Sequence, residues 1–368
     1  YTLSLHDALP IYHSGNEASA AFADFDNDGF PDLFVMKDGG DILYRNKGDG
    51  TFEDVTAKAK AGSSKGGKKA LFFDMDHDGD LDLFEILQDS NLFLRNNADG
   101  TFEDQSLKLG PQNGGIISTG AAFGDFDDDE DIDFIVVSKN SGIRLYSNQR
   151  QGVFRDIASE SGLKGFEGAG TVAVGDYNND GYLDLFIGSV TGENHALLRN
   201  LRNGTFEKEK NNAEIFRSLE KVNVYDASFL DFNNDGFLDI LVAGESQEKD
   251  GRGVNLFYND GKGNFKNVSE LLPPEIKSGK QITVFDYNDD GDLDVLIAGI
   301  NGGISLLRND GGNNNHFITM KLVGLKAGSA KNNYFGIGAK VEMRAGDLYE
   351  TMVVTDPGIH FGIGSNSR

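Results

Sequence analysis

Residues 24–32 read DFDNDGFPD, which places four aspartates, one asparagine and one glycine within nine positions. Five related stretches start at Asp74 (DMDHDGDLD), Asp125 (DFDDDEDID), Asp176 (DYNNDGYLD), Asp231 (DFNNDGFLD) and Asp286 (DYNDDGDLD). We refer to them as acidic loops one to six and number their residues from position 1 to position 9. Their starts are 50, 51, 51, 55 and 55 residues apart, and a period of about 50 residues is typical of a repeat protein.

A second landmark follows the first five loops. The sequence reads LYRNKGDGTF from Leu43, FLRNNADGTF from Phe93, LYSNQRQGVF from Leu145, LLRNLRNGTF from Leu197 and FYNDGKGNF from Phe257. Each copy has an apolar run, an Asn six residues before a Phe, and a Gly two residues before that Phe, which predicts a β-hairpin. The hairpin asparagines, which we expect to be structural, are Asn46, Asn96, Asn148, Asn200, Asn259 and Asn309.

The flanks of the acidic loops also predict strands. Short apolar runs such as KALFF precede a loop, and β-branched runs such as FIVV and ILVA follow one. Four short antiparallel strands per repeat are typical of a β-propeller blade, and the absence of Trp argues against the WD type. We predict an all-β protein with a β-propeller of four-stranded blades, of which six are visible and a seventh is expected in the intact protein.

The two ends of the sequence differ from the repeats. Residues 1–11, YTLSLHDALPI, resemble the translation of a sequencing adapter, so we expect a scar there and a lost N-terminus with its signal peptide. Residues 12–311 are assigned to the propeller. Residues 312–368 have alternating strands without an acidic loop, which predicts a small, truncated β-rich C-terminal module.

The acidic loops concentrate negative charge in a way that favours cation binding. Two carboxylates 4 Å apart repel by roughly 1 kcal/mol in water and about 4 kcal/mol at an effective dielectric near 20, and a bound cation converts this repulsion into attraction. Oxygen donors in a flexible loop favour Ca²⁺ over Mg²⁺. Positions 1, 5 and 9 are always Asp, and position 3 is Asp or Asn. Position 7 varies freely, as expected if its backbone carbonyl is the ligand.

We therefore predict up to six calcium sites. Their ligands are Asp24, Asp26, Asp28, Phe30 and Asp32; Asp74, Asp76, Asp78, Asp80 and Asp82; Asp125, Asp127, Asp129, Asp131 and Asp133; Asp176, Asn178, Asp180, Tyr182 and Asp184; Asp231, Asn233, Asp235, Phe237 and Asp239; and Asp286, Asn288, Asp290, Asp292 and Asp294.

Loop three departs from the pattern, because Glu130 replaces the glycine that a sharp turn at position 6 favours. We expect a distorted turn and the weakest site there. An EF-hand would need a Glu at position 12, where only Glu85 occurs, and flanking helices, which the strand-like flanks exclude. Solvated turns rich in Asp and Asn would explain one copy but not six with the same spacing.

Both landmarks together resemble FG-GAP/VCBS repeats of the integrin-α type over roughly residues 17–311. The segments NHFITMKLVG, FGIGAKVEMRAG and HFGIG resemble an ASPIC/UnbV domain, as found after such repeats in cartilage-acidic-protein-like proteins. The resemblance implies calcium held by positions 1, 3, 5 and 9 and by the carbonyl of position 7, which agrees with the ligand set above.

Charge and composition restrict the function. A formal net charge of −25 argues against nucleic-acid binding, and no apolar run reaches the roughly 18 residues of a membrane span. We predict a secreted, extracellular or cell-envelope adhesion scaffold for a protein or glycan partner, stabilised by calcium; its oligomeric state stays open. The alternative is a propeller enzyme, a hydrolase or lyase acting on carbohydrate or another extracellular substrate. The absence of a recognisable catalytic motif favours the scaffold.

Overall fold

The structure is a computed structural model that describes residues 18–109, 115–150, 152–210, 215–311, 315–325 and 332–366. The adapter-like segment lies outside these residues. The chain divides into two compact units. Unit 1 contains the described residues of Tyr1–Ser118, Gln149–Phe154 and Leu322–Ile337, and unit 2 those of Thr119–Asn148, Arg155–Lys321 and Gly338–Arg368.

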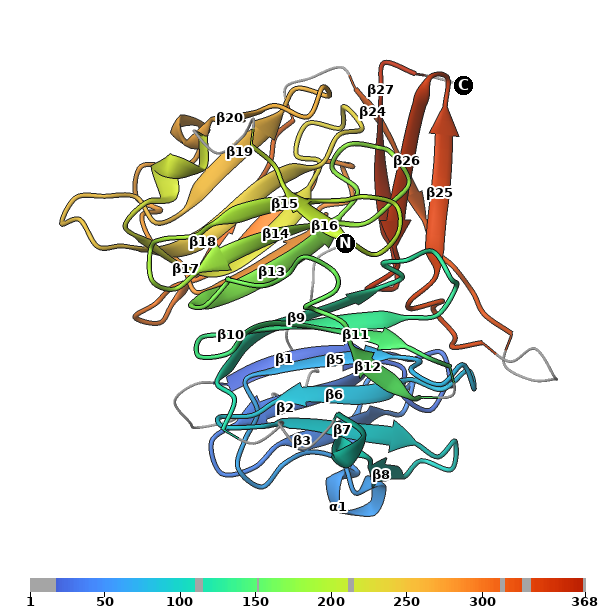
Figure 1. Cartoon of the computed structure of the whole chain (residues 1–368). Helices are drawn as coiled ribbons and strands as arrows, with labels where there is room; N and C mark the ends of the chain where they lie inside the picture. Colours follow the sequence, from blue (N-terminus) through green and yellow to red (C-terminus); the bar gives the residue numbers. More distant parts are fainter. Residues whose placement is uncertain are drawn as a thin grey trace. The chain divides into compact units, whose positions relative to one another are not determined.

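Each repeat forms one antiparallel sheet whose strands follow chain order, and five of these sheets have four strands. The first two blades, blue to cyan in Figure 1, belong to unit 1. Their strands are β1 (Ala18–Ala23), β2 (Asp32–Lys37), β3 (Ile42–Asn46) and β4 (Phe52–Asp54), then β5 (Lys69–Phe73), β6 (Asp82–Ile86), β7 (Asn91–Asn96) and β8 (Phe102–Asp104).

The remaining blades follow the same order. Their strands are β9 (Ser118–Gly124), β10 (Asp133–Ser138), β11 (Gly142–Asn148) and β12 (Phe154–Asp156); β13 (Ala169–Gly175), β14 (Asp184–Ser189), β15 (Ala196–Asn200) and β16 (Phe206–Lys208); β17 (Val222–Leu230), β18 (Asp239–Ser246), β19 (Asn255–Asn259) and β20 (Phe265–Asn267); and β21 (Gln281–Phe285), β22 (Asp294–Ala298) and β23 (Ile304–Leu307). The sixth blade thus has three strands in the described residues.

Helical structure is limited to single turns. They are the α-helix α1 (Thr56–Ala59) and the 3₁₀ turns η1 (Ser106–Leu109), η2 (Ile215–Leu219) and η3 (Ser269–Leu271). The predicted all-β propeller class is confirmed, and every acidic loop connects the first strand of its blade to the second. Position 9 is the first residue of that second strand, as Asp32 is in β2 and Asp184 is in β14.

Blade packing explains the apolar second strands. All six residues of β14 are buried, because core clusters shared with the third and fifth blades cover both of its faces. In unit 2, Phe216 from η2 lies between Phe186 and Phe257, with ring centroids 5.4 and 5.3 Å away. These contacts belong to a core cluster shared by the fourth and fifth blades. In unit 2, packed neighbouring sheets therefore support the end of acidic loop four.

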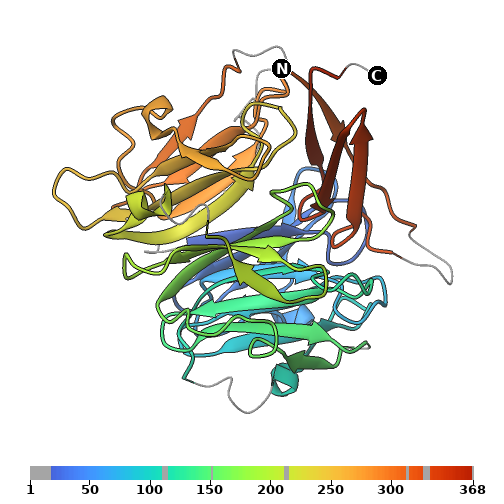
Figure 2. The same ribbon diagram turned by 45° about the horizontal axis from the view of Figure 1, so that its top comes forward.

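The C-terminal segment is rich in strands, as expected. β24 (His316–Met320) pairs with β27 (Ile359–Gly364), and β25 (Lys340–Ala345) pairs with β26 (Leu348–Val353). These strands, orange-red to dark red, lie side by side in both views (Figures 1 and 2). The predicted boundary between residues 311 and 312 stays a prediction.

Candidate metal centres in the acidic loops

The aspartate at position 1 organises each loop by accepting backbone hydrogen bonds. In loop one, the N–H of Asp28 donates to Asp24 Oδ1 at 2.9 Å and the N–H of Gly29 donates to Asp24 Oδ2 at 2.8 Å. The other five loops repeat both bonds. The backbone thus holds this carboxylate in a single orientation at the base of the loop.

The turn at position 6 uses positive φ angles in all six loops. Gly29 has φ 93° and Gly181 has φ 88°. Glu130 adopts φ 71° at the same position, and its N–H donates to Asp125 Oδ2 at 3.0 Å as the glycines do in the other loops. The expected distortion of this turn is therefore not seen. A non-glycine residue is strained at this φ, which agrees with a weaker third site. The lower affinity of this site stays a prediction.

The aspartate at position 9 joins the loop to the hairpin of its own blade. In loop one, Asp32 Oδ2 accepts the N–H of Phe25 at 3.1 Å, and Asp32 Oδ1 accepts the N–H of Asn46 at 2.7 Å. The hairpin asparagine N–H donates to position 9 in all six repeats, at 2.7–2.8 Å. Both landmarks of the sequence therefore meet at this carboxylate.

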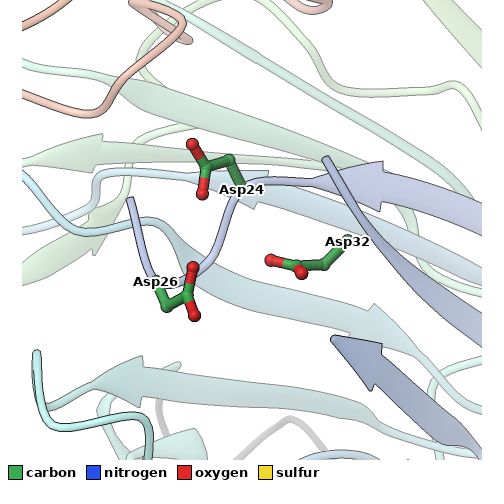
Figure 3. A group of neighbouring side chains, drawn as sticks. All are labelled: Asp24, Asp26 and Asp32. Carbon is green, nitrogen blue, oxygen red and sulfur yellow. The ribbon is translucent and has the colours of Figure 1, made fainter. Parts of the chain in front are cut away.

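Carboxylates converge where the sequence predicts metal ligands. Figure 3 shows Asp24 and Asp26 from loop one beside Asp32 from the start of β2. One oxygen from each of the three lies within 4.8 Å of the others. The same holds for positions 1, 3 and 5 of loop two and positions 1, 3 and 9 of loop three. Loops four to six have Asn at position 3, and their described residues bring no three carboxylates this close.

Unpartnered oxygens mark the interior of three loops. The side-chain Oδ1 atoms of Asp76, Asp127 and Asn178 are buried without a hydrogen-bond partner. All three occupy position 3, in loops two, three and four. Buried polar atoms are normally paired, so these oxygens lack the partner that a cation would provide. A set of carboxylate and amide oxygens fits a hard divalent cation.

Burial and mutual repulsion raise the pKa values of these carboxyl groups. Burial, followed by the charges of neighbouring aspartates, raises the pKa of Asp24 to about 6 and that of Asp32 to about 8. Burial and the charge of Asp235 raise the pKa of Asp231 to about 7. Backbone hydrogen bonds oppose these shifts without cancelling them. A bound cation would favour the ionised forms and reverse the direction.

Two arginines neutralise loops one and two from the side, which was not predicted from the sequence. Arg45 on β3 forms ion pairs with Asp26 and, at 2.9 Å, with Asp28. Arg95 on β7 repeats the arrangement, with Asp76 at 2.5 Å and Asp78 at 2.6 Å. Each arginine directly precedes a hairpin asparagine, but this position is not a sufficient signal, because Arg199 precedes Asn200 and pairs with Glu207 and Glu209 instead. In loop five, Tyr258 takes this place and donates to Asp235 at 3.2 Å.

Position 4 links one loop to the next, which was also missed. Within unit 1, Asn27 Nδ2 donates to the carbonyl of Gly79 at 2.9 Å and to Asp80 Oδ1 at 3.0 Å. Within unit 2, Asn234 Nδ2 donates to the carbonyl of Gly291 at 3.0 Å and to Asp292 Oδ1 at 2.9 Å. Two position-7 aspartates therefore use their side chains as acceptors for the preceding loop.

The hairpin asparagines connect neighbouring blades. Asn200 Nδ2 donates to the carbonyl of Leu183 in its own loop at 3.1 Å and to that of Phe126 in the preceding loop at 2.8 Å. Asn96, Asn259 and Asn309 make the corresponding pairs of bonds. These contacts support the structural role expected for these residues.

The chain was compared with known proteins. The model of the FG-GAP-like repeat matches residues 11–85, 125–187, 176–242 and 231–297. Cartilage acidic protein 1 of Xenopus tropicalis is 25% identical over 173 residues, which cover 45% of this chain and 26% of that protein. An Agrocybe aegerita lectin, solved for its recognition of non-reducing terminal N-acetylglucosamine, has a similar fold, with a TM-score of 0.51, 17% identity and 80% of each chain covered. Since the matched repeats span more than half of the sequence, the chain belongs to the FG-GAP-like repeat family.

Proposed function

We propose that this protein is a calcium-stabilised β-propeller that serves as an interaction scaffold for a protein or glycan. The observation that supports it best is the unpartnered, buried oxygen at position 3, which recurs in loops two, three and four. It lies in a loop whose position 1 is held by two backbone N–H groups in every repeat. The thirty residues predicted above are the proposed ligands, with the carbonyl oxygen contributing at position 7.

Location and partner follow from the same chemistry. Extracellular calcium modules bind with Kd values of about 10⁻⁴ to 10⁻³ M, which cytosolic calcium would not fill. We therefore place the protein outside the cell or in the cell envelope, with residues 312–368 as an ASPIC/UnbV domain. No helix in the described part of the chain is long and apolar enough to cross a membrane. The lectin with a similar fold makes glycans with terminal N-acetylglucosamine the first partners to test.

The enzyme alternative gains nothing from the cavity in unit 2. This cavity of about 150 Å³ is lined mainly by apolar side chains, among them Phe229, Leu293 and Met352. Its titratable groups are Asp231, a proposed metal ligand, and His360, whose Nε2 lies 2.7 Å from Asn234 Oδ1. Asp231 accepts backbone hydrogen bonds and His360 pairs with Asn234, so neither side chain is free to act as a catalytic acid or base.

Calcium is expected to raise the melting temperature. At 100 times Kd, each occupied site adds about 2.7 kcal/mol to the free energy of unfolding. Melting followed by circular dichroism in EGTA, in CaCl₂ and in MgCl₂ measures this increment. Asp74→Asn should reduce the increment, while Asp99→Asn in an exposed turn should leave it intact, because Asp99 only accepts bonds from Thr101. An equal midpoint in EGTA and calcium would contradict the proposal.

Partner binding is expected to require calcium. A glycan array that includes terminal N-acetylglucosamine, probed with labelled protein in calcium and in EGTA, measures it. Retention in calcium and loss in EGTA would support a glycan-binding scaffold. Release of shortened sugars from the retained glycans, followed by mass spectrometry, would instead support the enzyme.

A further inference from the structure

The residue at position 3 differs between the acidic loops, and with it the contact that position 3 makes. In loop five, Asn233 Nδ2 donates to Asp235 Oδ2 at 3.0 Å, and in loop six Asn288 Nδ2 donates to Asp290 Oδ2 at 2.7 Å. In loop four, the amide of Asn178 donates to the carboxylate at position 9 instead, at 3.2 Å. An ionised aspartate at position 3 has no N–H to donate, and it repels the carboxylate at position 5.

An arginine joins the two carboxylates in loops one and two. Arg95 donates through Nε to Asp76 Oδ2 at 2.5 Å and through a terminal nitrogen to Asp78 Oδ2 at 2.6 Å. Arg45 bridges Asp26 and Asp28 in the same way. The other oxygen of Asp76, Oδ1, is buried without a hydrogen-bond partner. The guanidinium therefore binds one oxygen of this carboxylate and leaves the second for a cation.

Other arginines at the same place in the hairpin do not turn to their loops. Arg199 and Arg308 also directly precede a hairpin asparagine, but position 3 of their loops is Asn. Arg199 pairs with Glu209 at 3.2 Å, and Arg308 pairs with Asp310 at 2.5 Å. An arginine thus bridges positions 3 and 5 only where both are aspartates.

The formal charges at positions 1, 3, 5 and 9 follow the same rule. Loops one and two have four aspartates there, and loops four to six have three. Four negative charges and one arginine in loops one and two equal the three negative charges of loops four to six. In loop four, Arg202 contacts Asp180 at 3.4 Å, but its side chain is 62% exposed, so water and salt screen this pair. Loop three is the exception, with Asp127 at position 3 and Ser147 in place of the arginine.

We propose that Arg45 and Arg95 supply a permanent counter-charge to the calcium sites of loops one and two. Each guanidinium holds the carboxylates of positions 3 and 5 together without calcium, and its positive charge lowers the affinity of the site for calcium. The proposal rests on the calcium-binding function proposed above. It makes both arginines positioning residues that reduce the dependence of the first two loops on calcium.

Arg95→Gln tests the proposal, because glutamine removes the positive charge. In EGTA, the variant should melt at a lower temperature than the wild type, since Asp76 and Asp78 then repel each other. Titration calorimetry of the full chain with CaCl₂ should show one site that binds about tenfold more tightly than in the wild type, because the charge of the ligands determines affinity. Arg199→Gln, at the same place in the fourth blade, is the matched control and should leave the calcium affinity unchanged.

Two further variants separate charge compensation from a merely structural role. Asp76→Asn in the Arg95→Gln background gives loop two the asparagine of loops four to six. This double variant should regain the melting temperature in EGTA and the calcium affinity of the wild type. Arg95→Lys, which keeps the charge, should resemble the wild type in both measurements.

The result for calcium affinity decides between this proposal and its alternatives. An unchanged or weaker affinity in Arg95→Gln, while the wild type binds calcium, would overturn the counter-charge role and leave the calcium function intact. Arg45→Gln provides the same test in loop one if the Arg95 variant does not fold. Absence of calcium binding by the wild type in calorimetry would instead overturn the proposed function and this proposal together.

Discussion

Replacing Asn200 by aspartate is expected to lower the free energy of unfolding by about 4 kcal/mol, although the two side chains have the same shape. Asn200 is 1% exposed, and its Nδ2 donates to the carbonyls of Phe126 and Leu183. Aspartate would turn this donor into an acceptor that faces two carbonyl oxygens. Each buried carbonyl left unsatisfied costs about 1–3 kcal/mol, and the buried charge adds to the loss.

A matched control lies in the same hairpin. Asn203 is exposed and acts only as an acceptor, with its Oδ1 taking bonds from the N–H and hydroxyl of Thr205. Asp49 and Asp99 make the same contacts with Thr51 and Thr101 in the first two blades. The free energy of unfolding of Asn203→Asp should therefore lie within about 0.5 kcal/mol of the wild-type value. Urea unfolding of both variants in calcium measures the difference, and equal stabilities would show that Asn200 does not connect the blades.

The repeat could be predicted because its signals are local. Asp24 and Asp32 lie eight residues apart, and the loop between them closes on itself through backbone N–H groups. Five of the six hairpin asparagines lie six residues before a phenylalanine, so their structural role was also accessible. The backbone turn followed from the glycine at position 6, and Glu130 shows that the rest of the loop can impose the same φ on a less suitable residue.

The contacts that were missed join segments far apart in the sequence. Arg45 reaches Asp26 across 19 residues, and Asn27 reaches Gly79 across 52. The N–H of Gly364 reaches the carbonyl of Asn234 only because the C-terminal strands fold back over loop five. No local spacing encodes such encounters, so the sequence predicted the loops as ligand sets without predicting the groups that surround them.

The environment of Glu85 also depends on the fold and could not be predicted from its position in the sequence. It occupies position 12 of loop two, where the other repeats have Val or Ile, and its side chain is fully buried with both oxygens unpartnered. It faces Asp41, whose Oδ2 accepts the N–H of Ser63 at 2.8 Å and whose Oδ1 accepts the N–H of Gly67 at 2.9 Å. The oxygens of Asp41 are thus bound by backbone donors, whereas the buried Glu85 carboxyl has no donor of its own.

Glu85→Gln is therefore expected to stabilise the protein, and increasingly so at higher pH. Burial first, and then the nearby Asp41, raises the pKa of Glu85 from 4.5 to about 10. A raised pKa means that the contribution of Glu85 to stability is complete below pH 4.5 and is lost as the pH rises toward 10. At about 1.4 kcal/mol per pH unit, the loss reaches about 3 kcal/mol at pH 7 and about 6 kcal/mol at pH 9.

Glutamine keeps the size of the side chain and does not ionise in this pH range, so the variant should escape this loss. Urea unfolding at pH 5, 7 and 9 should show a stability gain over the wild type that grows with pH. Glu53→Gln, on the exposed face of β4, is the control and should show no such trend. A gain independent of pH would mean that Glu85 ionises near its ordinary pKa despite its burial, and a loss at every pH would mean that its carboxylate has a partner that glutamine cannot replace.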